Sequence, residues 1–297
     1  MGIGTTIVLL GVAAVEFVRR QRSDEQALHE DERPPCRPKT DPDVGGRRPA
    51  IARSTAQVLP TSTADQRADV SRLPGRIMTD RMRDMLADLW PLYGLTIVTP
   101  HLQLRLPREE ELAELADLAG RGVHRPGERP FLTPWTDGSH ADRARCVLQA
   151  HWDRLASWDV AAWQLGMGVF RAGQPIGVVT LRARDFPVVR QVTTSAWLGV
   201  DHQGRGYGTE ARVGLLTLAF DHLGATAALT EVFQDNHSSQ GVSRKLGYEH
   251  DGISVDARDG AALVSDRLRL TRQRWRQQKR PAVTVDGMDS CRASFGL

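Results

Sequence analysis

The sequence predicts an α/β fold in which a mixed sheet of about seven mostly antiparallel strands carries helices on both faces. Between residues 86 and 276 the spacing of apolar residues switches repeatedly between the two-residue period of strands and the 3.6-residue period of helices. Short glycine-bearing turns join several of these strands as hairpins. One strand–helix–strand unit adds a crossover, and hairpins combined with a crossover are typical of a mixed sheet covered by helices.

The first half of this region predicts one strand followed by two helices. Alternation over residues 101–106 (HLQLRL) indicates the strand. Within residues 108–120 the apolar side chains recur at i, i+3, i+4 and i+7, so they share one helix face; they are Leu112, Leu115, Ala116 and Ala119. After a loop rich in Gly and Pro, Ser139 can cap a second helix that runs to about Leu155.

Strands dominate the second half. Residues 163–170 and 175–181 flank Arg171-Ala172-Gly173-Gln174, a hairpin turn that places glycine where a positive φ is tolerated. Residues 192–200 form the next strand and lead into a glycine-rich turn. The remaining predicted elements are a helix over 207–222, a strand over 227–233, a short helix over 238–246, and strands over 248–255 and 261–270 joined by a turn at Asp259-Gly260.

The two ends of the chain differ from this region. The apolar run within residues 1–22 is shorter than the about 20 residues that span a bilayer, and arginines follow it. We interpret it either as a membrane anchor over residues 3–18, with the folded domain in the cytoplasm, or as a misassigned start of a cytoplasmic protein. Residues 23–85 are rich in Pro, Arg, Asp, Ser and Thr and predict a disordered linker. Residues 277–297 predict a disordered tail.

Composition excludes several classes of protein. The 297 residues carry 39 basic and 36 acidic side chains, and 25% are charged, which suits a globular domain and not a protein with many membrane spans. Three cysteines are too few for a disulfide scaffold. The nine histidines contain no H-E-x-x-H pair and no two cysteines have metal-ligand spacing, so we expect no metal site.

Residues 267–280 (RLRLTRQRWRQQKR) hold seven bases and no acid. One interpretation is a weak contact with RNA or the ribosome, because clustered bases attract phosphate. The other, which we favour, is the solvated end of a last strand and a short helix.

The segment that points to chemistry is the glycine turn within residues 202–211 (HQGRGYGTEA). Gly204, Gly206 and Gly208 expose bare backbone between a strand and a helix, and the unpaired N–H groups of the helix start favour phosphate or pyrophosphate. The glycine turn does not contain the phosphate-loop pattern of nucleotide hydrolases. A dinucleotide pattern can be forced onto Gly206, Gly208 and Ala211, but the turn follows antiparallel hairpins and not a first parallel strand.

Two spaced blocks carry a family resemblance. Residues 203–208 (QGRGYG) match the acetyl-CoA loop [QR]-x-x-G-x-[GA], and residues 236–239 (NHSS) with 245–248 (KLGY) are similar to the later helix of the same family. Over roughly residues 86–275 the sequence resembles the GNAT N-acetyltransferases, and within them the branch that acetylates the N-termini of ribosomal proteins.

The resemblance implies direct transfer of the acetyl group from acetyl-CoA to a primary amine, either a protein N-terminus or a small amine, through a ternary complex. It leaves the acceptor and the oligomeric state open, and it places the acceptor pocket near residues 120–137 and 255–261. The residues that it implies for binding acetyl-CoA are Leu198, Gly199, Val200, Gln203, Gly204, Arg205, Gly206, Tyr207, Gly208, Thr209, Asn236 and Ser239.

The catalytic residues follow less directly. Many members of the family protonate the leaving thiolate with a tyrosine seven residues after the asparagine, but Ser243 stands there. The resemblance then implies Ser239 as the proton donor. Glu231 lies in an apolar strand and is either a buried acid that serves as the general base or an outward-facing strand residue. His151 and His202 are weaker candidates for the base. The missing tyrosine leaves an alternative, a catalytically silent regulatory module that binds acyl-CoA.

Overall fold

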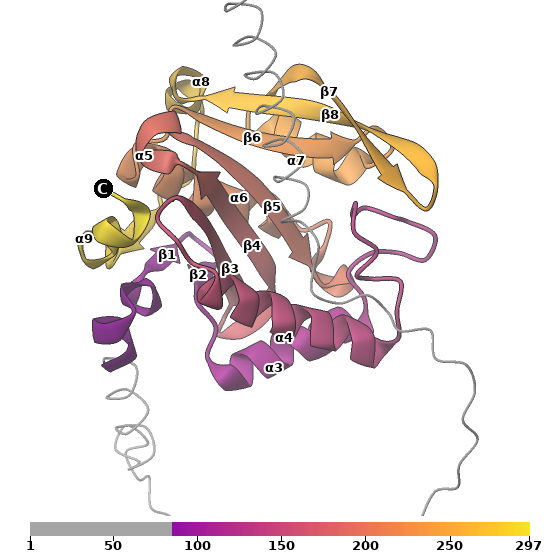
Figure 1. Cartoon of the computed structure of the whole chain (residues 1–297), viewed down its shortest axis with the longest axis horizontal. Coiled ribbons are helices and arrows are strands. Elements are labelled where there is room, and N and C mark those ends of the chain that lie inside the picture. Colours follow the sequence, from indigo (N-terminus) through magenta and orange to yellow (C-terminus); the bar gives the residue numbers. More distant parts are fainter. Residues whose placement is uncertain (1–84) are drawn as a thin grey trace, which may run out of the picture.

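The computed structural model describes residues 85–297 (Figure 1). The predicted anchor or misassigned start (residues 1–22) and all but the last residue of the predicted linker (residues 23–85) lie outside this range. Among the described residues, no helix is both long enough and apolar enough to cross a bilayer.

A single sheet of nine strands runs in the order β7-β8-β6-β5-β4-β3-β2-β1-β9. Every neighbouring pair is antiparallel except β5 and β6, which are parallel. The mixed, mostly antiparallel sheet of the prediction is therefore confirmed, with two more strands than expected. The strands are β1 (Thr96–Val98), β2 (Gln103–Arg105), β3 (Ala162–Arg171), β4 (Gln174–Arg184), β5 (Gln191–Leu198), β6 (Ala227–Phe233), β7 (Glu249–Arg258), β8 (Ala261–Thr271) and β9 (Thr284–Asp286).

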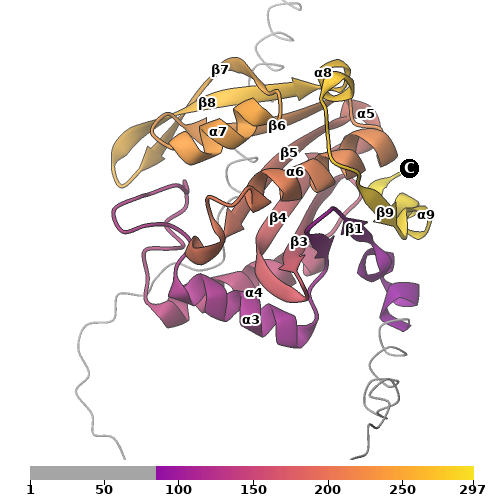
Figure 2. The ribbon, with the colours of Figure 1, turned by 180° about the vertical axis from the view of Figure 1, so that it is seen from behind.

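Helices cover both faces of the sheet. Figure 1 shows α3 and α4 together along one side, and the reverse view in Figure 2 brings α6 and α7 to the front. The helices are α3 (Glu109–Arg121), α4 (His140–Ala156), α5 (Phe186–Val189), α6 (Tyr207–Thr217), α7 (His237–Lys245), α8 (Arg272–Gln277) and α9 (Met288–Cys291). A π-helical turn, Leu218–His222, continues α6 to the predicted end of that helix.

Strand alternation assigns side chains to the two faces. On β3, Leu165 and Met167 pack into the main core with the apolar residues of α6, while Gly166 faces Arg154 on α4. On β4, Val178 belongs instead to a second cluster with α3 and α4. The sheet therefore separates an α6 face from an α3/α4 face, and this division organises the site.

The C-terminal segment corrects one prediction. Residues 277–297 were expected to be disordered, yet they form β9, α9 and a final 3₁₀ turn. Phe295 is completely buried, its ring lies 4.9 Å from that of Trp163, and Trp158 donates a hydrogen bond to the Ser294 carbonyl. A few isolated apolar residues hold the segment through tertiary contacts, which leave no periodic pattern in the sequence.

The basic segment, residues 267–280, is the second half of β8 followed by α8. Several of its charges have partners: Arg269 pairs with Asp251, Arg274 with Glu249 and Arg280 with Asp221. This is the strand end and short helix that we favoured, and the contact with RNA stays a prediction.

Candidate active site

The glycine turn joins β5 to α6 and is built for close approach to its backbone. Gly204 and Gly206 hold φ values of +74° and +86°, and a Cβ at either position would meet no atom within 4 Å. Gly206 is the N-cap of α6 and offers no side chain to the first helical N–H groups. The N–H groups of Tyr207, Gly208 and Thr209 have no intrahelical acceptor, so they are available to an anion.

Arginines surround this turn. Arg205 is exposed, and the guanidinium of Arg171 lies 5.3 Å from the centre of the Tyr207 ring. The pKa of His202 is lowered first by partial burial and then by Arg205, Arg171 and Arg121, with Asp201 opposing them. The field at the turn is therefore positive, which agrees with the binding of phosphate groups.

Gln203, expected to contact acetyl-CoA, uses its side chain differently. Its Nε2 donates to the carbonyls of Val123, 2.7 Å away, and Leu198, 2.9 Å away. The side chain thus ties the start of the turn to the end of α3 and to the end of β5. It positions the loop, and its amide donors are already used within the protein.

Beside the turn, β5 and β6 separate. Their parallel pairing stops at Thr193 and Leu229, so residues 194–198 of β5 and 230–233 of β6 have no register with each other. Figure 2 shows this splay next to α6 and α7. The Thr230 hydroxyl still donates to the Thr194 carbonyl at 3.2 Å. Beyond that contact the two strands share no backbone pairing, and an extended polar chain can join the β5 edge by backbone hydrogen bonds.

Fewer backbone N–H groups at the end of β5 are free to bind a ligand than we predicted. The Gly199 N–H donates to the Ile176 carbonyl and the Val200 N–H to the Gly122 carbonyl, so both are occupied. By alternation the Leu198 N–H points to the opposite side, into the splay. Gly199 also has a packing role, since a Cβ there would lie 2.5 Å from Leu118.

Helix α7 borders the splay with the predicted asparagine and serine. Asn236 is its N-cap, and its side-chain oxygen accepts from the Ser239 N–H at 3.1 Å. Ser239 is half-buried, and Ser243 lies one turn further along the same face and is fully buried. The Ser239 hydroxyl is therefore on the face of α7 that turns inward.

Glu231 takes the second of its two expected positions, that of an outward-facing strand residue. Its side chain is exposed and is not that of a buried base, whereas its neighbours Thr230 and Val232 are buried. Strand alternation turns Glu231 away from α6, to the face of the sheet that also carries the pocket described next. Its surroundings are therefore those of an accessible carboxylate and not of a desolvated one.

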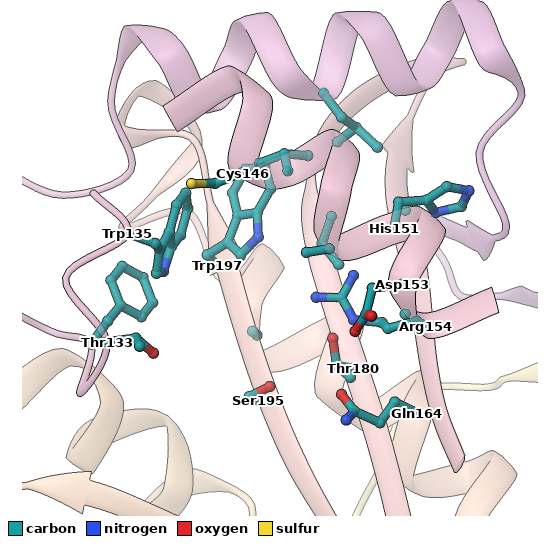
Figure 3. Close-up of a pocket in the computed structure, with 18 of the residues that line it drawn as sticks. Thr133, Trp135, Cys146, His151, Asp153, Arg154, Gln164, Thr180, Ser195 and Trp197 are labelled. Atoms are coloured by element: carbon teal, nitrogen blue, oxygen red, sulfur yellow. The ribbon is translucent and has the colours of Figure 1, made fainter. Parts of the chain in front are cut away.

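A pocket of about 270 Å³ opens on the α3/α4 face, drawn in Figure 3. One wall is aromatic: the rings of Phe131 and Trp135 lie 5.1 Å apart, and Trp135 lies 6.0 Å from Trp197 on β5. The loop between α3 and α4, predicted to build the acceptor pocket, supplies Phe131 and Trp135. The predicted last-hairpin residues 255–261 are not among its lining, although Arg258 donates to the Phe131 carbonyl.

The floor of the pocket is cationic and polar. Arg154 on α4 and Arg182 on β4 both line it, and Figure 3 shows Arg154 pointing inward above Thr180 and Gln164. Burial, followed by the charge of Arg182, lowers the pKa of Arg154 to about 10. Neither arginine could be recognised from the sequence, because the two come from separate elements and belong to no motif.

His151 is a poor base. It is 7% exposed, and burial followed by the charge of Arg154 lowers its pKa to about 4. The imidazole is therefore neutral at pH 7 and binds a proton weakly. In Figure 3 its ring points away from the inward-facing Arg154.

Several solved structures are similar to this chain over about three fifths of its length. A GNAT-family structure from Brucella melitensis, a GCN5-related N-acetyltransferase, is 18% identical, covers 61% of this chain and 80% of its own, and has a TM-score of 0.49. The ribosomal L7/L12 alpha-N-protein acetyltransferase RimL in complex with coenzyme A is 16% identical, with 59% and 96% covered and a TM-score of 0.46. A GNAT-family acetyltransferase from Bacillus anthracis is 11% identical, with 60% and 99% covered and a TM-score of 0.46.

The family assignment comes from the sequence itself. The family model for the acetyltransferase (GNAT) domain matches residues 101–249, which is half of the chain. These residues include β2 to β6, the glycine turn and α7. The chain therefore belongs to the GNAT family of acetyltransferases.

Proposed function

We propose that this protein is a cytoplasmic N-acetyltransferase that moves the acetyl group of acetyl-CoA directly to a primary amine, on a small molecule or a protein N-terminus. The observation that carries the proposal is the splay of β5 and β6. It lies beside the open glycine turn, and strand alternation places the acceptor-sized pocket on the opposite face of the sheet. Two substrates could meet there without a covalent enzyme intermediate.

The glycine turn fits the pyrophosphate of acetyl-CoA. Gly204 and Gly206 leave open space where any other residue would place a Cβ, and the first N–H groups of α6 have no intrahelical acceptor. Arg205 and Thr209 add a charge and a hydroxyl at the same turn. The Leu198 N–H is available to the pantetheine arm, and Asn236 and Ser239 border the arm from α7.

In the proposed reaction the amine nitrogen attacks the thioester carbonyl, a C–N bond forms and the C–S bond breaks. The thiolate takes up a proton, and the positively charged nitrogen of the tetrahedral adduct loses one, which leaves a neutral amide. Ser239 donates a hydrogen bond to the leaving sulfur. Glu231 accepts the amine proton through water, since it is exposed on the pocket face.

The acceptor pocket supports a compact amine or the first residues of a protein N-terminus. Its volume of about 270 Å³ limits the size, and the ring of Trp135 offers an apolar wall. Because Arg154 and Arg182 line the floor, the amines to be tested should include pairs that differ by one carboxylate.

The test combines binding with turnover. Purified full-length protein is heated with and without acetyl-CoA, and thiol release is then followed against amines and N-terminal peptides. We expect stabilisation by acetyl-CoA and amine-dependent thiol release, and we expect Ser239→Ala to lower turnover while acetyl-CoA still stabilises the variant. Stabilisation with no release for any amine would instead favour the silent acyl-CoA-binding module. No stabilisation would contradict both.

A further inference from the structure

A cation that the mechanism so far leaves unused is buried beneath the splay. Arg212, on α6, is 5% exposed. Its Nη2 donates to Thr194 Oγ1 at 2.7 Å and to Thr230 Oγ1 at 3.0 Å, and its Nη1 lies 3.5 Å from Ser243 Oγ. Within residues 85–297, its Nε has no hydrogen-bond partner.

No carboxylate within the described part of the chain neutralises this charge. Among the described residues Arg212 forms no ion pair, and the one titratable group that faces it is Tyr248, whose ring centre is 5.6 Å from the guanidinium carbon. Burial raises the pKa of Tyr248 above its usual value although Arg212 acts in the opposite direction, so the phenol is neutral. An uncompensated buried charge costs several kcal/mol, and a fold retains one where something else requires it.

The place of Arg212 and its hydroxyl partners in the sheet indicates why the fold keeps a charge there. Thr194 and Thr230 are the residues that follow the last paired positions of β5 and β6, Thr193 and Leu229. The guanidinium therefore lies at the apex of the splay, on its α6 side. A chain lying along β5 from Leu198 reaches Thr194 after about 14 Å of strand, so it would end against this cluster.

We propose that Arg212 stabilises the negative charge that develops on the departing sulfur, and that it acts partly by orienting the Thr194 hydroxyl. This inference rests on the proposed function. When the C–S bond breaks, its electron pair stays on sulfur, and a fixed positive charge in a water-poor site lowers the free energy of that state. Because Thr194 Oγ1 accepts from Arg212, its own proton points elsewhere, either to the Tyr248 hydroxyl 3.3 Å away or to a second acceptor such as the sulfur.

This role of Arg212 also explains why its hydrogen-bond partners are hydroxyl groups. Thr194, Thr230 and Ser243 leave the cation bound by neutral donors and acceptors, which hold it in place without cancelling its charge. A carboxylate partner would stabilise the fold more and would remove the field that the sulfur needs. Arg212 is accordingly a positioning residue whose charge acts across the cluster.

The experiment compares Arg212→Met with Arg212→Lys, Thr194→Val and a control, Arg276→Met, which removes an exposed cation from α8. In Arg212→Met we expect kcat to fall at least tenfold and KM for acetyl-CoA to stay within about twofold. Arg212→Lys should recover part of kcat because it restores the charge. The melting temperature of Arg212→Met should equal or exceed that of the wild type, since an unpaired buried charge has been removed.

A second readout needs no amine. The ultraviolet absorbance of the thiolate gives the pKa of the thiol of bound CoA, which should be lower in the wild-type complex than in Arg212→Met. Equal thiol pKa values and an unchanged kcat would overturn the inference, as would a loss of kcat that comes with a lower melting temperature and no recovery in Arg212→Lys. If Arg212→Met does not fold, Arg212→Lys and Thr194→Val test the inference in its place. Thr194→Val should lower kcat and leave KM unchanged. A wild type that binds CoA but acetylates nothing refutes the proposed function alone.

Discussion

Gly206 combines a left-handed backbone with open space at the position where other residues carry a Cβ. Its φ of +86° costs an L-residue about 1–2 kcal/mol, and a methyl group would project toward the proposed pyrophosphate. We expect Gly206→Ala to raise KM for acetyl-CoA at least tenfold, measured by initial rates. Gly260→Ala is the matched control, with a φ of +78° and the same open surroundings at the β7–β8 turn. It should lower stability by a similar amount and leave KM unchanged; a rise in KM for both would mean that strain alone explains the effect.

Glu111 gives a prediction that depends on pH. Burial acts to raise the pKa of its carboxyl, but hydrogen bonds from Arg105 at 2.7 Å and from Arg108 outweigh it and hold the pKa at about 2. Because the folded pKa lies below the unfolded value of about 4.3, this contribution is fully present above that value and is lost as the pH falls toward 2.

We therefore expect Glu111→Gln to lower the free energy of unfolding by about 2 kcal/mol at pH 7. The difference from the wild type should shrink below about pH 4.3 in urea titrations. Glu114→Gln, an exposed change on the same helix, should have little effect at either pH. A difference that stays constant between pH 7 and pH 3 would show that the charge of Glu111 is not the cause.

At the scale of elements, α7 depends on a side chain that also belongs to the proposed site. Asn236 caps the helix through its oxygen, which leaves its amide donors for a ligand. Asn236→Asp keeps the capping oxygen and removes the donors, whereas Asn236→Ala removes both. We expect Asn236→Ala to cost about 1 kcal/mol of stability and Asn236→Asp almost none, with KM for acetyl-CoA raised in both. A normal KM in Asn236→Asp would confine this residue to capping.

The C-terminal elements β9 and α9 add a test of packing. Phe295 is fully buried between Trp158 and Trp163, with ring centres 5.6 and 4.9 Å away. Phe295→Ala should cost about 3–5 kcal/mol in chemical denaturation. Val188→Ala, at a side chain that is 85% exposed, should change stability by less than about 0.5 kcal/mol. If Phe295→Ala lowers the free energy of unfolding by less than about 1 kcal/mol, the result would instead support the prediction that residues 277–297 are disordered.

Elements with a local signature were predictable and the others were not. The spacing of glycines and apolar residues predicts the strand, turn and helix around Gly206. Ser139 caps α4 as expected, because its hydroxyl accepts from the Asp142 N–H. The three-residue strands β1 and β9 are too short for alternation to show, and the Phe295 contacts join residues far apart in the chain. For the same reason Arg212 gave no signal, because its partners come from β5, β6 and α7.

At the scale of the whole molecule, the sheet divides two tasks. The α6 face carries the glycine turn, α7 and the buried Arg212, and the α3/α4 face carries the pocket with its aromatic wall. The splay of β5 and β6 interrupts the sheet between them. The direct transfer that we propose uses this arrangement, because the two substrates reach the splay from opposite faces of the sheet.

Whether both substrates bind before the acetyl group moves is the most direct test of transfer across the splay. Initial rates of thiol release are measured while acetyl-CoA and the best amine are varied together. The account predicts that double-reciprocal lines intersect, because both substrates are bound before the acetyl group moves, and that mass spectrometry finds one acetyl group on the amine. Parallel lines, or thiol release that does not depend on the amine, would contradict direct transfer across the splay.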